Sequence, residues 1–327
     1  MKVLITGSSG LIGRWVADRL KMEGCQVIGL DKAPPPAMSC LDESIQVDIL
    51  NQAALLAALK NSAPDALIHL AARIDLNETR KLNGYAANIE GVRNVIESVR
   101  QTPTIRRFIS TSSQLVCRVG YVPQSETDYC PNTLYGQSKV LTEQITREMD
   151  GGGKEWCLVR PTTVWGPYMG VHYQGLLKLI QNGRYFHCGH SPLYKSYSFA
   201  GNIAYQYWKL LAAPATAIHG KTFYLADYEP LSLRAYTNAL AKELGAPLIP
   251  TVPLPFARFL AVVGDVFNAV GWRSFPFNNF RLNNILTEYQ FDLSPTRAVC
   301  GELPYGFEDG IGATAKWYLE SIKNQSK

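Results

Sequence analysis

Short apolar segments alternate with amphipathic segments along the first half of the chain. The apolar segments have the length of buried strands and lie at Lys2–Thr6, Gln26–Leu30, Ile45–Val47, Ala66–Leu70, Arg107–Ser110 and Trp156–Val159. Between them, helical spacing of apolar positions runs through Leu11–Met22, Gln52–Lys60, Asn83–Arg100 and Thr133–Met149. Strands that alternate with helices imply right-handed crossovers. We therefore predict an α/β fold with a doubly wound parallel sheet covered on both faces.

The pattern loosens after about Gly166. Helical stretches follow at Gln174–Gln181, Asn202–Leu211, Ser232–Leu244, Phe256–Val270 and Asp309–Ser321, and only a few strands, such as Thr222–Leu225, are credible there. Proline- and glycine-rich loops separate them. The sequence thus predicts a first domain over 1–166 and a smaller, mostly helical region over 167–327 that is interleaved with it. We expect that region to bind the substrate.

Composition narrows the class of protein. The 327 residues are 46% hydrophobic and 18% charged, which excludes a disordered chain. The net charge of +5 is mild, and no basic run carries interleaved aromatics, so no nucleic-acid partner is expected. No signal peptide is visible. Seven scattered cysteines without a CxxC pair are typical of reduced thiols, so we expect a cytoplasmic location.

Two features of the second half are given plain interpretations. Arg258 and Asp265 interrupt the apolar helix 256–270, so it is not expected to span a membrane. That helix can touch a membrane, line an apolar substrate pocket or be buried in the C-terminal core, and the sequence favours burial. His187-Cys188-Gly189-His190 lacks the further ligands of a closed zinc site, so no metal is expected.

A glycine-rich turn stands where the first strand meets the first helix. Its sequence is Thr6-Gly7-Ser8-Ser9-Gly10-Leu11-Ile12-Gly13. Glycines permit a tight turn and close backbone approach to a pyrophosphate, and the helix N-terminus supplies free N–H groups. We expect the cofactor contacts of this turn to be Gly7, Ser9, Gly10, Leu11, Ile12 and Gly13.

Asp31 ends the second predicted strand, where a carboxylate accepts hydrogen bonds from an adenosine ribose and repels a 2′-phosphate. This favours NAD over NADP. The neighbouring Lys32 keeps NADP open, and a turn-capping role for Asp31 is the alternative.

Tyr135 and Lys139 stand at i and i+4 on one helix face. A free tyrosine has a pKa of about 10. A nearby ammonium favours the phenolate and so makes Tyr135 a better proton acceptor. Lys139 can also hold the nicotinamide ribose. The serine-rich end of the fifth strand, residues 110–113, precedes this pair; a helix-capping loop is its alternative role.

The GxxGxxG spacing, Tyr135 and Lys139 together resemble the extended short-chain dehydrogenase/reductase family, in its epimerase/dehydratase branch. The resemblance covers nearly the whole chain and implies a Rossmann-type NAD-binding domain. By resemblance, Ser113 is the catalytic hydroxyl beside Tyr135 and Lys139, and Asn88 steadies the active-site backbone. Further cofactor contacts implied in the same way are Asp48, Ile49, Leu70, Ala71, Ala72, Thr111, Pro161 and Thr162.

Substrate contacts are less well specified. Ser113, Arg73 and Thr163 are the candidates, with a plain ion pair as the alternative for Arg73. Sugar-nucleotide dehydratases of the family carry Asp-Glu where this chain has Gln114-Leu115, which disfavours dehydration. Thr163 replaces the asparagine of many nucleotide-sugar epimerases and is closer to steroid-dehydrogenase and flavonol-reductase relatives.

Two softer matches point towards bacterial polysaccharide synthesis. They are the segments at residues 195–202 and 301–311. The leading prediction is an NAD-dependent epimerase of a nucleotide sugar, acting by hydride transfer at a carbinol carbon. The alternatives are a dehydrogenase or reductase of a less polar alcohol, as in steroid or flavonoid relatives, and a non-catalytic NAD-binding sensor. The resemblance also implies a homodimer through helices 83–100 and 133–149.

Overall fold

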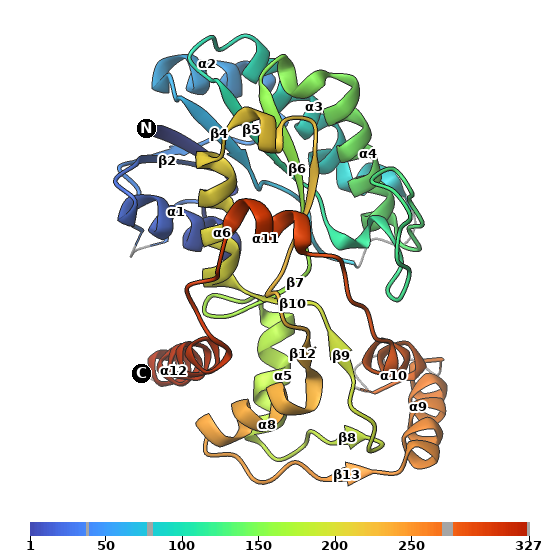
Figure 1. Cartoon of the computed structure of the whole chain (residues 1–327). Coiled ribbons are helices and arrows are strands. Elements are labelled where there is room, and N and C mark those ends of the chain that lie inside the picture. Colours follow the sequence, from blue (N-terminus) through green and yellow to red (C-terminus); the bar gives the residue numbers. More distant parts are fainter. Residues whose placement is uncertain (37–38, 77–80, 270–276, 326–327) are drawn as a thin grey trace. The chain divides into compact units, whose positions relative to one another are not determined.

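The structure, a computed structural model, describes residues 1–36, 39–76, 81–269 and 277–325 (Figure 1). The chain forms two compact units. Unit 1 contains Met1–Trp165, Tyr197–Tyr228 and Phe291–Tyr305, and unit 2 contains Gly166–Ser196, Glu229–Gln290 and Gly306–Lys327. The chain first leaves unit 1 after Trp165, and two later segments return to it.

Unit 1 is built on a seven-stranded sheet in the order β11-β6-β5-β4-β1-β2-β3. Every pairing in it is parallel. The strands, in sheet order, are β11 (Thr222–Leu225), β6 (Glu155–Pro161), β5 (Arg107–Thr111), β4 (Ala66–His69), β1 (Lys2–Thr6), β2 (Gln26–Asp31) and β3 (Glu43–Gln46). The successive strands are added on one side of β1 as far as β3 and on its other side from β4 onwards. Open α/β sheets bind ligands at such a switch point, which here lies between β1 and β4. The predicted doubly wound, Rossmann-type sheet is confirmed.

Helices cover both faces of this sheet (Figure 1). One face carries α1 (Leu11–Met22), α6 (Ala200–Ala212) and α11 (Ser294–Cys300). The other carries α2 (Gln52–Ser62), α3 (Ala86–Arg100) and α4 (Leu134–Glu148). The 3-10 helices η1 (Leu82–Tyr85), η2 (Gln114–Val116) and η3 (Asp150–Gly152), the short helix α7 (Ala215–Ile218), and the paired strands β7 (Thr163–Trp165) and β10 (Tyr197–Phe199) complete the unit.

Side-chain alternation along the strands explains why both faces are covered. In β1, Val3 and Ile5 belong to the apolar cluster beneath α1 and α6, whereas Leu4 belongs to the cluster beneath α2 and α3. All three side chains are fully buried. A strand buried on both sides reads as a continuous apolar run, which is the pattern seen in the sequence.

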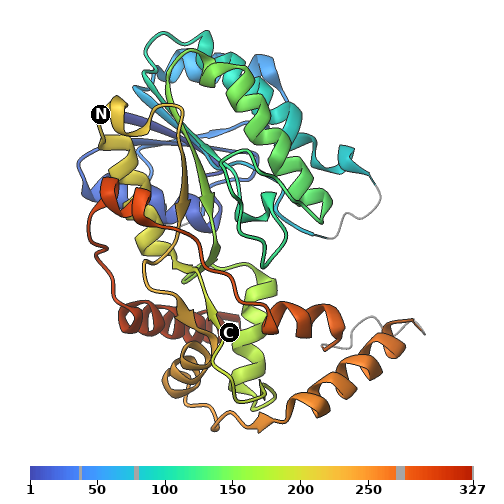
Figure 2. The ribbon, with the colours of Figure 1, turned by 45° about the vertical axis from the view of Figure 1, so that its right-hand side comes forward.

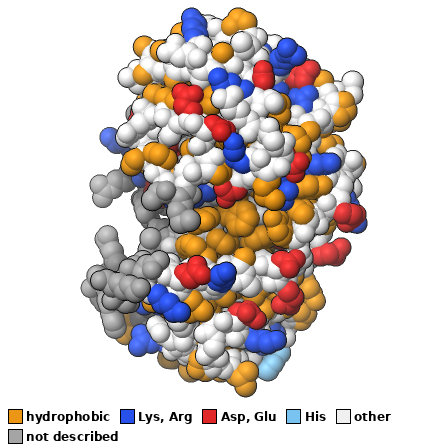
Figure 3. All heavy atoms as spheres, turned by 90° about the vertical axis from the view of Figure 1, so that its left-hand side faces the viewer, with side chains coloured by type: hydrophobic (Ala, Val, Ile, Leu, Met, Phe, Trp, Pro, Cys, Tyr) orange, Lys and Arg blue, Asp and Glu red, His pale blue; other side chains and the backbone are white. Residues whose placement is uncertain are grey.

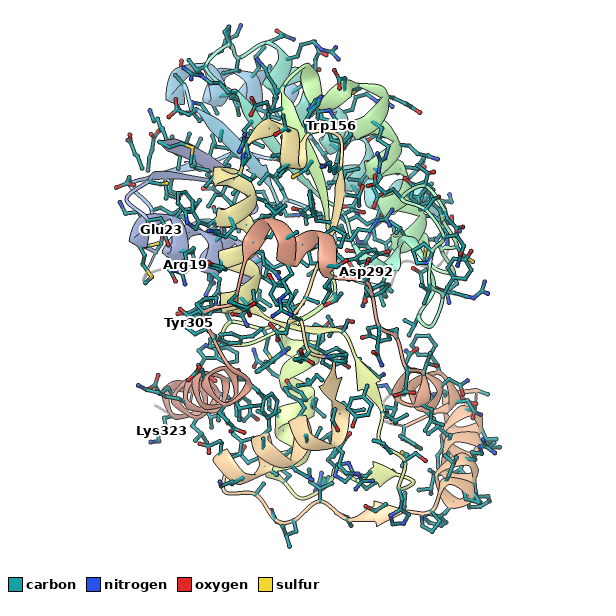
Figure 4. The ribbon with its side chains drawn as sticks, viewed as in Figure 1. Arg19, Glu23, Trp156, Asp292, Tyr305 and Lys323 are labelled. Atoms are coloured by element: carbon teal, nitrogen blue, oxygen red, sulfur yellow. The ribbon has the colours of Figure 1, made fainter. Side chains whose placement is uncertain are left out.

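Polar groups remain at the ends of the elements. Trp156, labelled in Figure 4, lies at the amino end of β6, whereas Arg160 lies near the carboxyl end. On α1, Arg19 and Glu23 form an exposed i, i+4 ion pair at 3.2 Å. Figure 3 shows acidic and basic side chains interspersed on the face it presents, as a mild net charge predicts.

Unit 2 is mostly helical, as expected. Its helices are α5 (Val171–Gln181), α8 (Leu233–Glu243), α9 (Leu254–Ala269), α10 (Asn279–Leu286) and α12 (Phe307–Gln325). Two pairs of two-residue strands accompany them: β8 (His187–Cys188) with β13 (Thr251–Val252), and β9 (Tyr194–Lys195) with β12 (Leu231–Ser232). Strands this short carry no periodicity, so the sequence did not reveal them.

The expected burial of helix 256–270 is wrong over its described part. Ala257, Ala261 and Gly264 of α9 are buried, but four of its larger apolar side chains are exposed and the others are half-buried. Val270 lies outside the described residues. In the described part of the chain, no helix has the length and apolarity needed to cross a membrane.

Candidate active site

The glycine turn between β1 and α1 is shaped by close backbone contacts. Gly7 has a φ of +74°, and a Cβ there would lie 2.6 Å from the amide nitrogen of Ala71. A Cβ on Gly13 would lie 2.3 Å from the carbonyl oxygen of Gly7. Gly10 occupies the N-cap position of α1 but has no side chain that could accept a hydrogen bond. It therefore leaves the first N–H groups of the helix available to another acceptor. Leu11 and Ile12 open this first turn of α1.

Asp31 is held against the turn. Its carboxylate accepts hydrogen bonds from the backbone N–H groups of Ser9 and Ala33, both at 3.0 Å. A carboxylate has about four acceptor positions, so two ribose hydroxyls can still be accommodated. The turn-capping role and the ribose-binding role are therefore compatible. The adjacent Lys32 is exposed.

Arg14 is a feature of this turn that the sequence analysis missed. Its Nε donates to the carbonyl oxygen of Ser9 at 3.0 Å. The residue directly follows the last glycine of the motif, which was the available signal. It stabilises the turn and adds positive charge where a pyrophosphate is expected.

The next strand ends place the other expected cofactor contacts. Asp48 is exposed and accepts from the N–H of Leu50 at 2.9 Å, whereas the Ile49 side chain is buried in the core. Beyond β4, the amides of Leu70 and Ala71 donate to the hydroxyl of Thr6. Ala72 follows in the same partly exposed segment. The backbone of Leu70 and Ala71 therefore lies beside the carboxyl end of β1, at the point between β1 and β4 where the strand order reverses.

Asn88 ties three parts of the site together. From α3, its side chain binds both backbone polar atoms of Arg73, at 2.8 and 3.0 Å. Its amide nitrogen also donates to the hydroxyl of Ser138 on α4 at 2.9 Å. Because Asn88 is fully buried, these bonds fix the segment after β4 relative to α4. A role for Asn88 in steadying the active-site backbone remains a prediction, and these contacts are compatible with it.

Arg73 is engaged within unit 1. Its guanidinium forms an ion pair with Asp75 at 2.7 Å, donates to the carbonyl of Gly84 and lies over the ring of Tyr85. The side chain is about one third exposed. The ion-pair alternative of the sequence analysis is thus present, and a substrate contact for Arg73 remains a prediction.

Tyr135 and Lys139 lie on the buried face of α4, where the i, i+4 spacing puts them. The Lys139 ammonium donates to the carbonyl oxygen of Thr111 at 2.9 Å. Burial lowers the pKa of Lys139 to about 8, against the opposing effect of Glu143. At neutral pH the lysine therefore remains charged. Burial of the His69 imidazole, together with the charge of Lys139, lowers the pKa of His69 to about 3, so that imidazole is neutral.

The end of β5 presents a hydroxyl cluster. The Ser113 hydroxyl accepts from the N–H of Leu115 at 3.1 Å, so its own proton is free to be donated elsewhere. Ser112 instead donates to Glu143 at 2.6 Å. The Thr111 hydroxyl pairs with that of Tyr207 at 2.8 Å. Of these three hydroxyls, Ser113 suits the role of contacting a reacting oxygen.

Gln114 and Thr163 contact each other beside Ser113. The Gln114 amide nitrogen donates to the Thr163 hydroxyl at 3.3 Å. Its amide oxygen is buried and has no partner among the described residues. The residues before Thr163 are fixed by the sheet, because Pro161 ends β6 and the Thr162 hydroxyl pairs with that of Ser198 at 2.7 Å. A buried amide oxygen without a partner is a place where a substrate hydroxyl can bind.

A fully buried ion pair lies behind the hydroxyl cluster, and its acidic member was missed. Arg160 binds both oxygens of Glu143 at 2.8 Å. Tyr129 donates to the same carboxylate at 3.0 Å. Burial alone would lower the pKa of Arg160, but the bonds and charge of Glu143 hold it above its ordinary value. Glu143 stands four residues after Lys139, a spacing that could have revealed it.

The histidine- and cysteine-containing segment at residues 187–190 lies in unit 2. His187 contacts Asn238 at 3.0 Å, and Cys188 packs in an apolar cluster. Among the described residues, no three histidine, cysteine or acidic side chains group in a way that would hold a metal ion.

The donor set fits a dinucleotide. Unit 1 offers N–H groups at the start of α1 that Gly10 does not cap, the Asp31 carboxylate and a buried ammonium at Lys139. A parallel sheet with these groups and a Ser-Tyr-Lys set beyond its carboxyl ends defines a dinucleotide-dependent oxidoreductase.

The comparisons with known proteins agree. Residues 3–225 match the model of the NAD dependent epimerase/dehydratase family. The chain belongs to that family, within the extended short-chain dehydrogenases/reductases, and is an NAD-dependent enzyme.

Relatives with determined or curated properties are distant. The chain is 24% identical to N-acetyl-alpha-D-glucosaminyl-diphospho-ditrans,octacis-undecaprenol 4-epimerase of Escherichia coli O157:H7, covering 98% of this chain and 96% of that one. It is 25% identical to a 3-beta-hydroxysteroid dehydrogenase of Mycolicibacterium neoaurum, covering 76% and 71%. Its fold resembles that of a Thermotoga maritima UDP-glucose 4-epimerase, with a TM-score of 0.75, 17% identity and coverage of 98% and 100%.

Proposed function

We propose that this enzyme inverts a hydroxyl-bearing carbon of a sugar joined to a diphosphate, with nucleotide sugars as the leading class. The observation that carries the proposal is the Ser113, Tyr135 and Lys139 set beside an NAD-type Asp31. The epimerase match over nearly full length supports it. Gln114 in place of an acid argues against dehydration.

The chemistry that bound NAD supplies is reversible acceptance of a hydride from the carbinol carbon. Tyr135 removes the proton of the substrate hydroxyl, and the charged Lys139 stabilises the phenolate. Ser113 donates a hydrogen bond to the same oxygen as it becomes a carbonyl. When the hydride returns to the opposite face of the ketone carbon, Tyr135 would return the proton to the same oxygen, and the inverted alcohol leaves.

The second candidate is oxidation or reduction of a less polar alcohol. Thr163 and the similarity to a hydroxysteroid dehydrogenase favour it. The names of the two relatives compared by sequence point to substrates with a large hydrocarbon part, an undecaprenol carrier in one and a steroid in the other. We therefore extend the leading proposal to sugar diphosphates whose carrier is a lipid.

Thermal unfolding of the NAD-loaded protein with UDP, GDP, dTDP or CDP tests substrate recognition. A ligand at about one hundred times its Kd adds about 2.7 kcal/mol, so one nucleotide should raise the midpoint clearly. No shift with any of them would move the assignment to the lipid-linked sugar or the apolar alcohol. Tyr135→Phe should keep the shift and lose turnover, and an unchanged turnover would refute the catalytic assignment.

Assembly and location form part of the proposal. We infer a homodimer through α3 and α4, because the resemblance to the extended short-chain dehydrogenase/reductase family implies pairing through these helices; light scattering during gel filtration tests it. All seven cysteines lie in the described structure as free thiols, which supports a reducing, cytoplasmic compartment.

A further inference from the structure

Helix α9 of unit 2 buries only small residues fully, and four of its large apolar side chains are exposed, whereas Leu260, Val263 and Phe267 are half-buried. Its buried positions are Ala257, Ala261 and Gly264. The four exposed apolar side chains form a solvent-facing stripe, here called the α9 stripe, whose members are 49–62% exposed: Phe256, Phe259, Val262 and Val266. An ordinary surface helix has the opposite arrangement. The α9 stripe is therefore a surface that another apolar medium is expected to cover.

The surroundings of the stripe leave it accessible within unit 2. Figures 1 and 2 show α9 at the rim of the unit, with α10 beside it on one side. Phe280 at the start of α10 is a further aromatic side chain that is 62% exposed. Apolar exposure thus continues from one helix to its neighbour.

Charges next to the stripe are mostly basic. The charged residues of α9 and α10 are Arg258, Asp265 and Arg281, and all three are exposed. The single acid accepts a hydrogen bond from the Asn279 amide at 2.6 Å. The whole chain carries +5. Arginines bordering an aromatic and aliphatic face match the interface of an anionic lipid bilayer.

We propose that the α9 stripe docks on the surface of an anionic phospholipid bilayer, with the helix lying in the plane of the membrane. Sixteen residues span about 24 Å, less than the hydrocarbon core, so the helix lies on the bilayer and does not cross it. This deepens the proposed function, because an enzyme on the membrane surface can reach a sugar diphosphate whose carrier is a lipid.

A second copy of the chain is the weaker occupant. Four side chains of this size at about half exposure offer on the order of 400 Å², whereas each partner of a stable interface contributes about 800 Å². A bilayer imposes no such minimum, and it accepts a stripe without a matching shape.

Co-sedimentation of the full-length protein with extruded vesicles tests the proposal. Vesicles of phosphatidylcholine with about one third phosphatidylglycerol should bind the wild type, and Phe259→Gln/Val266→Gln should lower the bound fraction at least fivefold. The matched control is Met22→Gln/Val122→Gln, which removes two comparably exposed apolar side chains from unit 1 and should bind within twofold of the wild type. Arg258→Gln should weaken binding to anionic vesicles more than to neutral ones.

Two results would overturn the docking surface. One is a wild type that stays in the supernatant with both vesicle types; the other is equal binding by the wild type and the α9 variant. A dimer that the α9 variant dissociates, without vesicle binding, would assign the stripe to a second copy instead. The thermal shift given by NAD is read on the same variants, so loss of docking with an intact shift leaves the enzymatic proposal standing. Vesicle binding without a thermal shift from NAD would contradict the enzymatic proposal and leave the docking surface standing.

Discussion

Lys139 keeps its charge in a buried position, and its ammonium is held by the Thr111 carbonyl at 2.9 Å. Because burial lowers its pKa to about 8, the free enzyme loses this charge as the pH rises through 8. We predict that kcat/KM, which reports the free enzyme, falls above about pH 8. A profile that stays flat from pH 7 to 10 would contradict this role.

The same pKa makes a stability prediction. An unfolded lysine titrates near 10.5, so between about pH 8 and 10.5 the unfolded state binds more protons and stability rises with pH. Below pH 8 the buried charge costs stability. Lys139→Met should therefore lose activity while its melting midpoint at pH 7 is unchanged or higher, and its stability should no longer rise above pH 8. A strongly lowered midpoint at pH 7 would show that the charge is stabilising.

The amide oxygen of Gln114, which follows Ser113 in the chain, has no hydrogen-bond partner in the described part of the structure. If a substrate hydroxyl donates to it, Gln114→Ala removes one hydrogen bond, worth about 1 kcal/mol. We expect KM for the substrate to rise about five- to tenfold, with the NAD affinity unchanged. Steady-state kinetics and an NAD titration separate the two effects, and a weakened NAD affinity would mean that Gln114 acts on the cofactor side.

At the scale of the elements, the ion pair of Glu143 and Arg160 joins α4 to β6. Both side chains are at most 1% exposed. Removing one member of such a pair leaves an uncompensated buried charge, which costs about 3–5 kcal/mol. Glu143→Gln should destabilise the protein on this scale in urea unfolding.

A matched double variant separates charge from packing. Glu143→Leu/Arg160→Met removes both charges. Its loss in free energy of unfolding should be smaller than the summed losses of the single variants Glu143→Leu and Arg160→Met. Additive losses would show that the two side chains do not act as a pair.

The elements that the sequence predicted well are those that bury one or two faces over many residues. β1 and α1 begin and end at the predicted residues. An uninterrupted apolar run and an amphipathic stretch each indicate clearly which type of element forms and where it ends. The predicted strand Ile45–Val47 is Glu43–Gln46 in the structure, where an exposed edge carries little pattern. The predicted helix 83–100 begins with a 3-10 turn in the structure. The sequence analysis placed α9 in the core because a high content of apolar residues does not show which face of a helix is buried.

At the scale of the whole molecule, the candidate site was predicted from local motifs, whereas contacts between segments far apart in sequence could not be predicted. Tyr135 and Lys139 were found because they share a helix, and Asp31 because it ends a strand. The return of residues 197–228 and 291–305 to unit 1 depends on β11 pairing with β6, a parallel contact between segments far apart in sequence. The partnership of Ser112, Glu143 and Arg160 likewise exists only after folding.

The central claim is that one carbon is oxidised and then reduced again within a single active site. The direct measurement uses the NAD-loaded enzyme with nucleotide and lipid-linked sugars that carry deuterium on the ring carbinol carbons. The account predicts an inverted product that keeps its deuterium at the inverted carbon, with no lasting rise in absorbance at 340 nm from reduced cofactor. Deuterium lost to water, or reduced cofactor accumulating with the product, would contradict it.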